Sequence, residues 1–183
     1  LKNINKNKNT KVSYIPFFMK TISYILKELT VFNTSLNTDK KSLIQKHYIN
    51  VGCAVESPKG LVVPVIKNID KKSIKEITIE FNKIVSKARK GKLSIEDMSG
   101  GCITISSLGN IGGQYFTPII NSPEVAILGI SPIQIESIFK NNKFVPRKML
   151  PISLSYDHRV INGSDAARFT DLFSKLIGHP TKL

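Results

Sequence analysis

The sequence lacks the features that mark most membrane and metal-binding proteins. No apolar run is long enough to cross a membrane, and no hydrophobic signal core follows the lysine-bearing first residues. There are only two cysteines, Cys53 and Cys102, and they lie in strand-like runs without metal-type spacing. We expect small buried thiols in a reducing compartment, although the sequence leaves open that the two thiols meet in space. These absences predict a soluble, cytoplasmic protein that uses no metal.

Arginine is also scarce, although the chain is strongly basic. Only four of the 27 basic residues are arginines, and the formal net charge is +14. Such a charge would favour nucleic acid, but no zinc-ligand spacing, aromatic ribonucleoprotein signature or glycine-rich RNA-binding motif accompanies the lysines. We therefore expect a solvated basic surface and no nucleic-acid partner. A positive field that attracts acidic partners or a polyphosphate ligand is the alternative.

Length and composition predict one domain. The 183 residues, 41% of them hydrophobic, suffice for a single substantial core. Residues 1–11 are rich in lysine and asparagine and are predicted to be mobile, whereas residues 12–183 should form the domain.

Helical and strand-like patterns alternate along this domain, as in α/β proteins. Apolar positions recur at helical spacing from Ile15, Ser73 and Ser164, and Ser73 starts a capping-box pattern. Residues 33–37 read as a turn. Strand-like runs occupy residues 48–55, 61–66, 102–107, 125–130 and 150–154, and the first two are expected to form a hairpin with Pro64 at an edge or bulge.

A polar cluster follows the last of these runs, in the sequence Asp157-His158-Arg159-Val160-Ile161-Asn162-Gly163. Histidine is the side-chain type that titrates near neutrality, so His158 is suited to acid–base chemistry. The Asn-Gly pair predicts a sharp turn at Gly163, and Ser164 could cap the helix that follows. The alternative is a surface ionic cluster of Asp157, His158 and Arg159 beside an ordinary turn.

A glycine-rich loop follows another strand, in the run Thr104-Ile105-Ser106-Ser107-Leu108-Gly109-Asn110-Ile111-Gly112-Gly113. It lacks the Lys-Ser/Thr ending of a phosphate-binding loop and the spacing of a dinucleotide fingerprint. Glycines permit close approach of a ligand to backbone, which makes Gly109, Gly112 and Gly113 weak candidates for substrate binding. Taken alone, the run predicts only a tight turn.

These two motifs, in this order, resemble those of the acyltransferase component of 2-oxo acid dehydrogenase complexes. The resemblance extends from about Lys11 to about Lys175, and Asn162, where many relatives have Asp, is most like the pyruvate dehydrogenase branch. The resemblance implies a two-layer α/β sandwich with a mixed β-sheet, like chloramphenicol acetyltransferase. It also implies homotrimers that assemble into a large hollow core, with His158 of one chain facing the Ser106 loop of another.

The resemblance implies transfer of an acetyl group from a dihydrolipoyl thioester to coenzyme A. His158 would act as general base, Ser106 would stabilise the oxyanion, and Asn162 would fix the loop by hydrogen bonding. Asp157, Arg159 and Gly163 would shape the loop.

The resemblance also implies partners that lie outside this chain. The lipoate would be carried on a separate lipoyl domain, and the decarboxylase and dihydrolipoamide dehydrogenase components would bind through the full-length protein. A lipoyl domain, a subunit-binding domain and the opening segment of the family's catalytic domain, with an arginine near the active site, have no counterpart in the sequence. We therefore expect a fragment of a longer protein. A bacterial protein is expected rather than a mitochondrial one.

Two alternatives stay open from the sequence: a free chloramphenicol-type acetyltransferase, and a structural core that has lost activity. A hydrolase triad of Ser106, His158 and Asp157 is a poor competitor. Asp157 is adjacent to His158 in sequence, which suits it badly to orient the imidazole, and the serine lacks a nucleophile-elbow motif.

Overall fold

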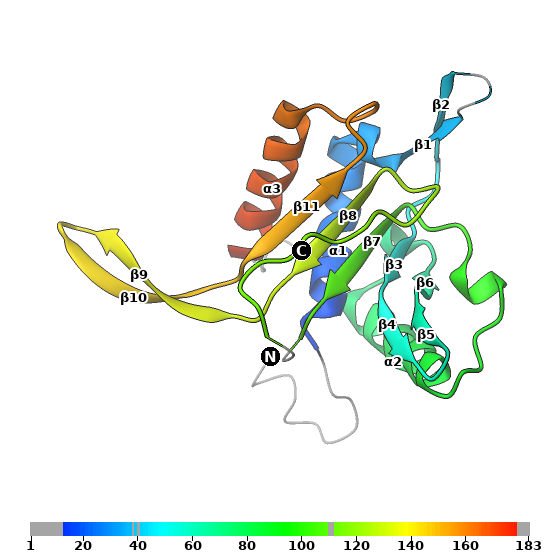
Figure 1. Ribbon diagram of the computed structural model, residues 1–183, viewed down its shortest axis with the longest axis horizontal. Coiled ribbons are helices and arrows are strands. Elements are labelled where there is room, and N and C mark those ends of the chain that lie inside the picture. The colour runs from blue at the N-terminus through cyan, green and yellow to red at the C-terminus, as the bar shows by residue number, and fades with distance from the viewer. Residues whose placement is uncertain (1–12, 38, 40, 110–111, 179–183) are drawn as a thin grey trace.

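A five-stranded mixed β-sheet organises the structure (Figure 1). The computed structural model describes residues 13–37, 39, 41–109 and 112–178, so the predicted mobile segment at residues 1–11 lies outside the described residues. The strand order is β11 (Ile152–Tyr156), β8 (Ala126–Ile130), β7 (Ile103–Ser107), β3 (Val51–Cys53) and β6 (Val65–Ile66). Strand β7 runs parallel to β3 and β8, whereas the edge strands β11 and β6 are antiparallel to their neighbours.

Helices provide the second layer. Helices α1 (Ile15–Glu28), α2 (Ile74–Arg89) and α3 (Gly163–Gly178) pack with the sheet into one hydrophobic core. Short 3-10 helices at Thr30–Asn33, Ile69–Lys71 and Glu96–Met98 connect the elements. The predicted capping box is confirmed, because Ser73 accepts from the Glu76 backbone while the Glu76 carboxylate accepts from Ser73. The rings of Phe32 and Phe169 pack with centroids 4.7 Å apart and tie α3 into the core.

The other face of the sheet is crossed by the segment at residues 112–124, which connects β7 to β8 (Figure 1). Gly129 permits this close packing. A Cβ atom there would lie 3.0 Å from the Phe116 ring and 3.2 Å from Pro118, so a larger residue would push the segment off the sheet.

Three hairpins extend from the sheet. They pair β1 (Thr34–Asn37) with β2 (Ser42–Gln45), β4 (Val55–Ser57) with β5 (Gly60–Val62), and β9 (Gln134–Lys140) with β10 (Lys143–Met149). The β9–β10 hairpin projects away from the body (Figure 1). The predicted turn at residues 33–37 is wrong. Thr34 begins a strand there, next to Asn33, whose side chain donates to the carbonyls of Lys46 and Tyr48 and so helps to set the pairing.

The predicted hairpin at residues 48–66 is present but interrupted. It forms the pairs β3–β6 and β4–β5, with breaks near Ala54 and Pro64. Pro64 precedes the edge strand β6 and its carbonyl accepts from Cys53 at 3.0 Å, which matches the predicted edge or bulge. Cys53 and Cys102 are buried free thiols, as expected. No helix in the described part of the chain is long and apolar enough to span a membrane.

We expect Phe169→Ala to destabilise the protein by about 3–5 kcal/mol, because it removes a fully buried ring and leaves a cavity under α3. Denaturant unfolding measures this change. Ile95, which is 81% exposed, offers a matched control, and Ile95→Ala should change the free energy of unfolding by less than about 0.5 kcal/mol. Equal effects of the two substitutions would contradict the placement of α3.

Candidate active site

Ser106 lies near the carboxyl end of the central strand β7. Ile103 and Ile105 of this strand are buried in the core with the helices. Because side chains alternate along a strand, Thr104 and Ser106 face the opposite side, where the segment at residues 112–124 crosses the sheet. Ser106 is half-buried there. Its hydroxyl is thus held by a rigid strand and remains accessible.

The glycine loop after β7 owes its composition to backbone conformation. Gly109, Gly112 and Gly113 have φ values of 54°, 123° and 84°, a region that other residues enter only with strain. A Cβ atom at Gly109 or Gly112 would meet nothing within 4 Å. The loop is anchored at its start, where the Gly109 amide donates to Ser107 Oγ and the Leu108 amide donates to the Ile130 carbonyl.

His158 lies in the loop after β11, at the edge of the sheet. The loop is attached through Asp157, whose amide donates to the Val125 carbonyl at 2.8 Å. The Asp157 carbonyl accepts from the amides of Val160 and Ile161, which closes the turn. The His158 side chain is exposed, and its ring centroid lies 5.6 Å from that of Tyr156. Backbone hydrogen bonds therefore position a histidine that faces outward from its own chain.

Asp157 pairs with Arg159. The guanidinium donates to both carboxylate oxygens, with Nη2 to Oδ2 at 2.7 Å, and the Arg159 amide donates to Oδ1 at 3.0 Å. These hydrogen bonds hold the pKa of Asp157 below its usual range. Since the carboxylate is engaged in this way, the geometry gives no support to a hydrolase triad through Asp157.

Asn162 and Gly163 differ from the sequence prediction. Gly163 is the first residue of α3 and its φ is not positive, so the predicted sharp turn at this residue is wrong. Asn162 precedes the helix and accepts through its carbonyl from Asp165 and Ala166, both at 3.0 Å, whereas Ser164 lies within the first turn and does not cap it. The Asn162 side chain is exposed and makes no hydrogen bond within the described part of the chain.

The structure does not bring Ser106 and His158 together within one chain. Ser106 is level with Gly129 on β8, which in turn pairs with Ser153 on β11. Because β11 runs antiparallel to β7, His158 follows Ser153 by five residues toward the opposite end of the sheet. Strand β11 extends three residues beyond Ser153, to Tyr156, so the start of the His158 loop is roughly 10 Å away along the strands, with two strand spacings added across them.

A cavity of about 660 Å³ opens near the carboxyl end of β7. Ser107 lines it together with Cys53, Glu56, Phe81 and Arg89. This volume lies in the range of small-molecule sites. Sequence analysis missed this cavity, because its walls come from five elements, α1, β3, β4, α2 and β7, that are spread along the chain.

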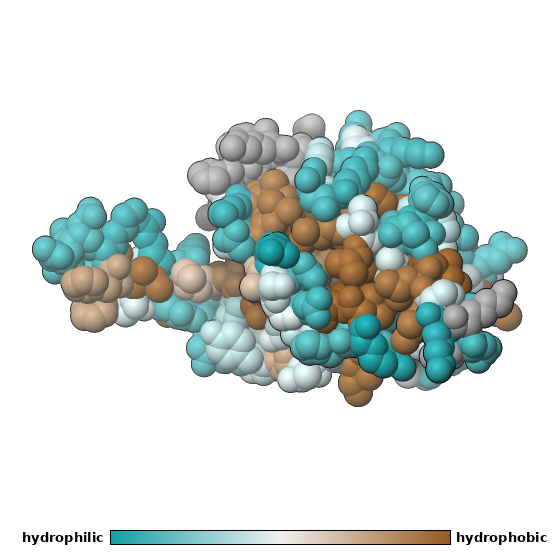
Figure 2. Space-filling model, turned by 90° about the horizontal axis from the view of Figure 1, so that it is seen from above, coloured by the Kyte–Doolittle hydropathy of each residue, from teal (hydrophilic) through white to brown (hydrophobic). Residues whose placement is uncertain are grey.

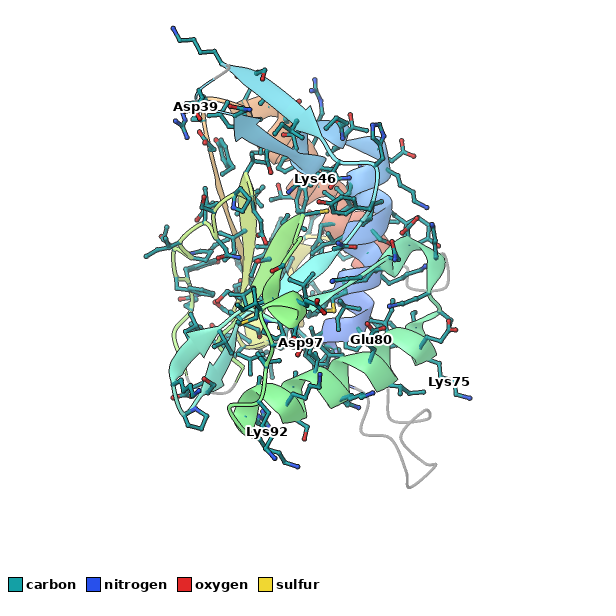
Figure 3. All side chains as sticks on the ribbon, turned by 90° about the vertical axis from the view of Figure 1, so that its right-hand side faces the viewer. Asp39, Lys46, Lys75, Glu80, Lys92 and Asp97 are labelled. Atoms are coloured by element: carbon teal, nitrogen blue, oxygen red, sulfur yellow. The ribbon has the colours of Figure 1, made fainter. Side chains whose placement is uncertain are left out.

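A buried polar cluster at the His158 end of the sheet was also missed. Glu124 Oε1 accepts from Thr104 Oγ1 at 2.9 Å and from Asn121 Nδ2 at 3.4 Å. Lys46 lies inside the body, whereas Lys75 and Lys92 project outward (Figure 3). The Lys46 ammonium donates a hydrogen bond to the Gly101 carbonyl at 2.9 Å.

Burial governs the titration of this cluster. It raises the pKa of the Glu124 carboxyl to about 7, against the opposing effects of the Thr104 and Asn121 hydrogen bonds and of the Lys46 charge. Burial also lowers the pKa of Lys46 and raises that of the Cys102 thiol. Among the described residues, no group of His, Cys, Asp or Glu side chains could hold a metal ion.

Comparison with known proteins identifies the family. The family model described as 2-oxoacid dehydrogenases acyltransferase (catalytic domain) matches residues 1–183. The chain belongs to this family. It is 51% identical over 172 residues to the dihydrolipoyllysine-residue acetyltransferase component of the pyruvate dehydrogenase complex from Buchnera aphidicola, a match that covers 94% of this chain and 43% of the relative. The chain therefore spans less than half the length of this relative.

Solved structures of the family have the same fold. The cubic core of the pyruvate dehydrogenase multienzyme complex superposes with a TM-score of 0.93 at 48% identity, over 97% of this chain and 73% of that chain. Dihydrolipoamide acetyltransferase from Azotobacter vinelandii, with the same coverage, gives 0.93 at 47% identity. Its structure concerns the role of a serine, a histidine and an asparagine in catalysis, and these residues are spaced 52 and then 4 positions apart.

The predicted fold class is confirmed by a more distant structure. Chloramphenicol acetyltransferase superposes with a TM-score of 0.59 at 12% identity, over 95% of this chain and 81% of that chain. At that identity the likeness concerns the fold alone, a sandwich of helices on a mixed sheet.

We expect Glu124→Gln to stabilise the protein above neutral pH. The folded-state pKa of about 7 exceeds the ordinary value of 4.5, so the native carboxyl binds a proton more tightly than the unfolded one. The wild type therefore loses stability as the pH rises through this window, by up to about 3 kcal/mol, and glutamine avoids that loss. Urea unfolding of both proteins at about pH 5 and about pH 8 measures the difference. A difference that does not grow with pH would show that Glu124 ionises normally.

Proposed function

We propose that this chain is the catalytic domain that transfers an acetyl group from a dihydrolipoyl thioester to coenzyme A, in the core component of a pyruvate dehydrogenase complex. One observation carries the proposal. His158 follows Ser106 by 52 positions, and Asn162 follows His158 by 4. The serine, histidine and asparagine studied for their role in catalysis in the Azotobacter vinelandii enzyme have the same spacing. The identity of about one half to pyruvate dehydrogenase relatives favours acetyl as the acyl group.

His158 serves as the general base in this reaction. A thiol with a pKa near 8.5 is mostly protonated at neutral pH, so it needs a proton acceptor before it becomes nucleophilic. A neutral His158 imidazole takes the proton of the coenzyme A thiol as its sulfur attacks the thioester carbonyl. The imidazolium then returns the proton to the departing dihydrolipoyl sulfur, so the reaction yields acetyl-coenzyme A and a free dithiol.

Ser106 stabilises the charge that develops on the carbonyl oxygen. Attack of the sulfur produces a tetrahedral oxyanion, and a hydroxyl on a rigid strand can donate a hydrogen bond to it without reorganisation. Loss of one such donor typically raises the barrier by about 3 kcal/mol. The exposed Asn162 side chain, at the start of α3, is available to fix the neighbouring loop. It has no charge and cannot form an ion pair with an arginine.

The glycine loop supports a substrate path at the Ser106 end of the sheet. Gly109, Gly112 and Gly113 carry no side chains, so a substrate arm could pass close to the backbone at these three positions. The cavity beside Ser107 lies at the same end of β7 but on the helix side of the sheet, because Ser107 alternates with Ser106 along the strand.

The active site assembles between two copies of the chain. Ser106 and His158 lie at opposite ends of the sheet, so a second copy has to place its His158 loop against the Ser106 loop of the first. A closed trimer satisfies this head-to-tail contact, and trimers can build the hollow core. A solved relative is itself a cubic core, which supports this assembly. The contacts with lipoyl domains, decarboxylase and dihydrolipoamide dehydrogenase, and the cytoplasmic location, stay predictions.

The β9–β10 hairpin supports contact with another copy. One of its faces exposes Ile135 (72%), Phe139 (62%) and Phe144 (71%), and Figure 2 shows apolar side chains along one side of the projection. An exposed apolar hairpin of this kind would favour aggregation of an isolated chain, and such surfaces are typical of protein–protein interfaces.

The alternatives are less well supported. The 12% identity to chloramphenicol acetyltransferase, against about one half to the pyruvate dehydrogenase relatives, disfavours a free acetyltransferase of that type. An inactive structural core would keep the assembly but would show no turnover of acetyl-dihydrolipoamide with coenzyme A.

We expect His158→Ala and Ser106→Ala each to reduce turnover by at least about 100-fold, because each removes one group from every site. Co-expression of the two variant chains in equal amounts should restore about one quarter of wild-type turnover, since random assembly gives that share of interfaces an intact serine and an intact histidine. Steady-state assays of full-length protein measure this recovery. Co-expressed protein no more active than either variant alone would place the whole site within one chain.

We expect Ser substitution of Ile135, Phe139 and Phe144 together to prevent trimer formation while the chain still folds, because these side chains are exposed in the single chain. Light scattering measures the mass and circular dichroism the fold. Ser substitution of Lys140 and Lys143 at the tip of the same hairpin is the matched control and should leave the mass unchanged. An apolar-face variant with native mass would show that the hairpin is not an assembly contact.

A further inference from the structure

The Glu124 carboxyl is buried and only half satisfied. Glu124 is 5% exposed, Oε1 accepts the hydrogen bonds from Thr104 and Asn121, and Oε2 has no hydrogen-bond partner among the described residues. A buried polar atom without a partner costs free energy, so its retention calls for an explanation. Leucine or glutamine would fill the position without burying an ionisable group.

The surroundings are shaped to hold this carboxyl. A Cβ atom at Gly101 would collide with Glu124 Oε1, so only glycine allows the start of β7 to pass beside it. The Gly101 carbonyl is held by the Lys46 ammonium, and the next glycine along, Gly100, has a φ of 78°. Lys46 and the Cys102 thiol are the other titratable groups that face Glu124. The Glu124 carboxyl thus links the start of β7, through Thr104 and Gly101, to the turn before β8.

Glu124 is adjacent in sequence to Val125, whose carbonyl holds the His158 loop. The Glu124 amide donates to the Asn121 carbonyl at 3.0 Å, and the Pro123 carbonyl accepts from Ser35 at 2.7 Å. The next residue, Val125, provides the carbonyl that binds the Asp157 amide at 2.8 Å. A shift of the Glu124 turn would therefore move the hydrogen bond that sets where the His158 loop leaves the sheet.

We propose that Glu124 is a positioning residue for His158, which acts by fixing the turn at residues 121–124 against Thr104 and thereby the Val125 carbonyl that holds the loop. The inference rests on the proposed function only in that His158 is the base. Displacement of a catalytic group by about 1 Å can reduce turnover by about 100-fold without loss of binding. Glu124 would accordingly affect the chemical step through His158 and make no contact with substrate.

The test compares Glu124→Ala, Glu124→Gln and the exposed control Glu96→Ala in the full-length protein. We expect Glu124→Ala to lower kcat at least about tenfold with KM for coenzyme A changed less than about twofold, since binding groups stay in place. Glu124→Gln keeps the shape and should retain kcat within about threefold. Glu96→Ala should match the wild type.

A second measurement does not depend on the reaction. The rate at which diethyl pyrocarbonate modifies His158, followed by peptide mass spectrometry, should change at least about threefold in Glu124→Ala and return to the wild-type rate in Glu124→Gln. If the wild type showed no acetyl transfer, the proposed function would be wrong. The modification rate would still report whether Glu124 sets the position of the His158 loop.

Three results would overturn the inference: unchanged kcat in Glu124→Ala, an equal loss in Glu124→Gln, or an effect confined to KM. If Glu124→Ala does not fold, Thr104→Val removes the donor to Oε1 with little change of shape. Thr104→Val should lower kcat and should change the rate of His158 modification in the direction expected for Glu124→Ala. Wild-type values of both quantities would reject Glu124 as a positioning residue.

Discussion

The direction of one strand determines how this site can be built. Strand β11 is antiparallel to β8 and hence to β7, so the two segments that follow β7 and β11 leave the sheet at opposite ends. No rearrangement of loops a few residues long closes a separation of this size. Under the proposed function, the imidazole and the hydroxyl therefore belong to a site formed between two copies of the chain. Sheet topology, rather than any feature of the loops, sets their separation within one chain.

Close packing on the second face of the sheet is the other constraint. Three positions on or beside the strands, Gly52, Gly101 and Gly129, have no room for a side chain, because Thr104, Glu124 and Phe116 occupy that space. The connecting segment at residues 112–124 is thereby pressed against the sheet at both of its ends. One end carries the glycine loop beside Ser106 and the other carries Glu124 beside the His158 attachment. A single segment thus runs from the Ser106 loop to the turn beside the His158 loop.

The sequence predicted the parts of the fold whose signals are local. The helices from Ile15 and Ser73 and the buried strand at residues 125–130 follow from periodicity and capping, and the structure has all three. The prediction of a turn at residues 33–37 was wrong because this run is short and polar, and its strand conformation depends on pairing with β2 and on the hydrogen bonds of Asn33. Glu124 could not be found, since nothing in a Pro-Glu pair indicates that Thr104 and Gly101 will enclose it. The separation of Ser106 from His158 within one chain was expected from the family resemblance alone, because the local patterns of a single sequence do not contain strand order.

The pairing of Asp157 with Arg159 adds a consequence for the chemistry. In many sites that use histidine, a carboxylate of the same chain orients the imidazole, but here the adjacent carboxylate is occupied by the guanidinium. His158 is exposed, and its ring lies beside that of Tyr156. If His158 is the base that we propose, the groups that orient its imidazole and exclude water from it come from the chain that covers it. The proposed function therefore couples catalysis to assembly, and in a separated chain His158 would stay exposed to solvent.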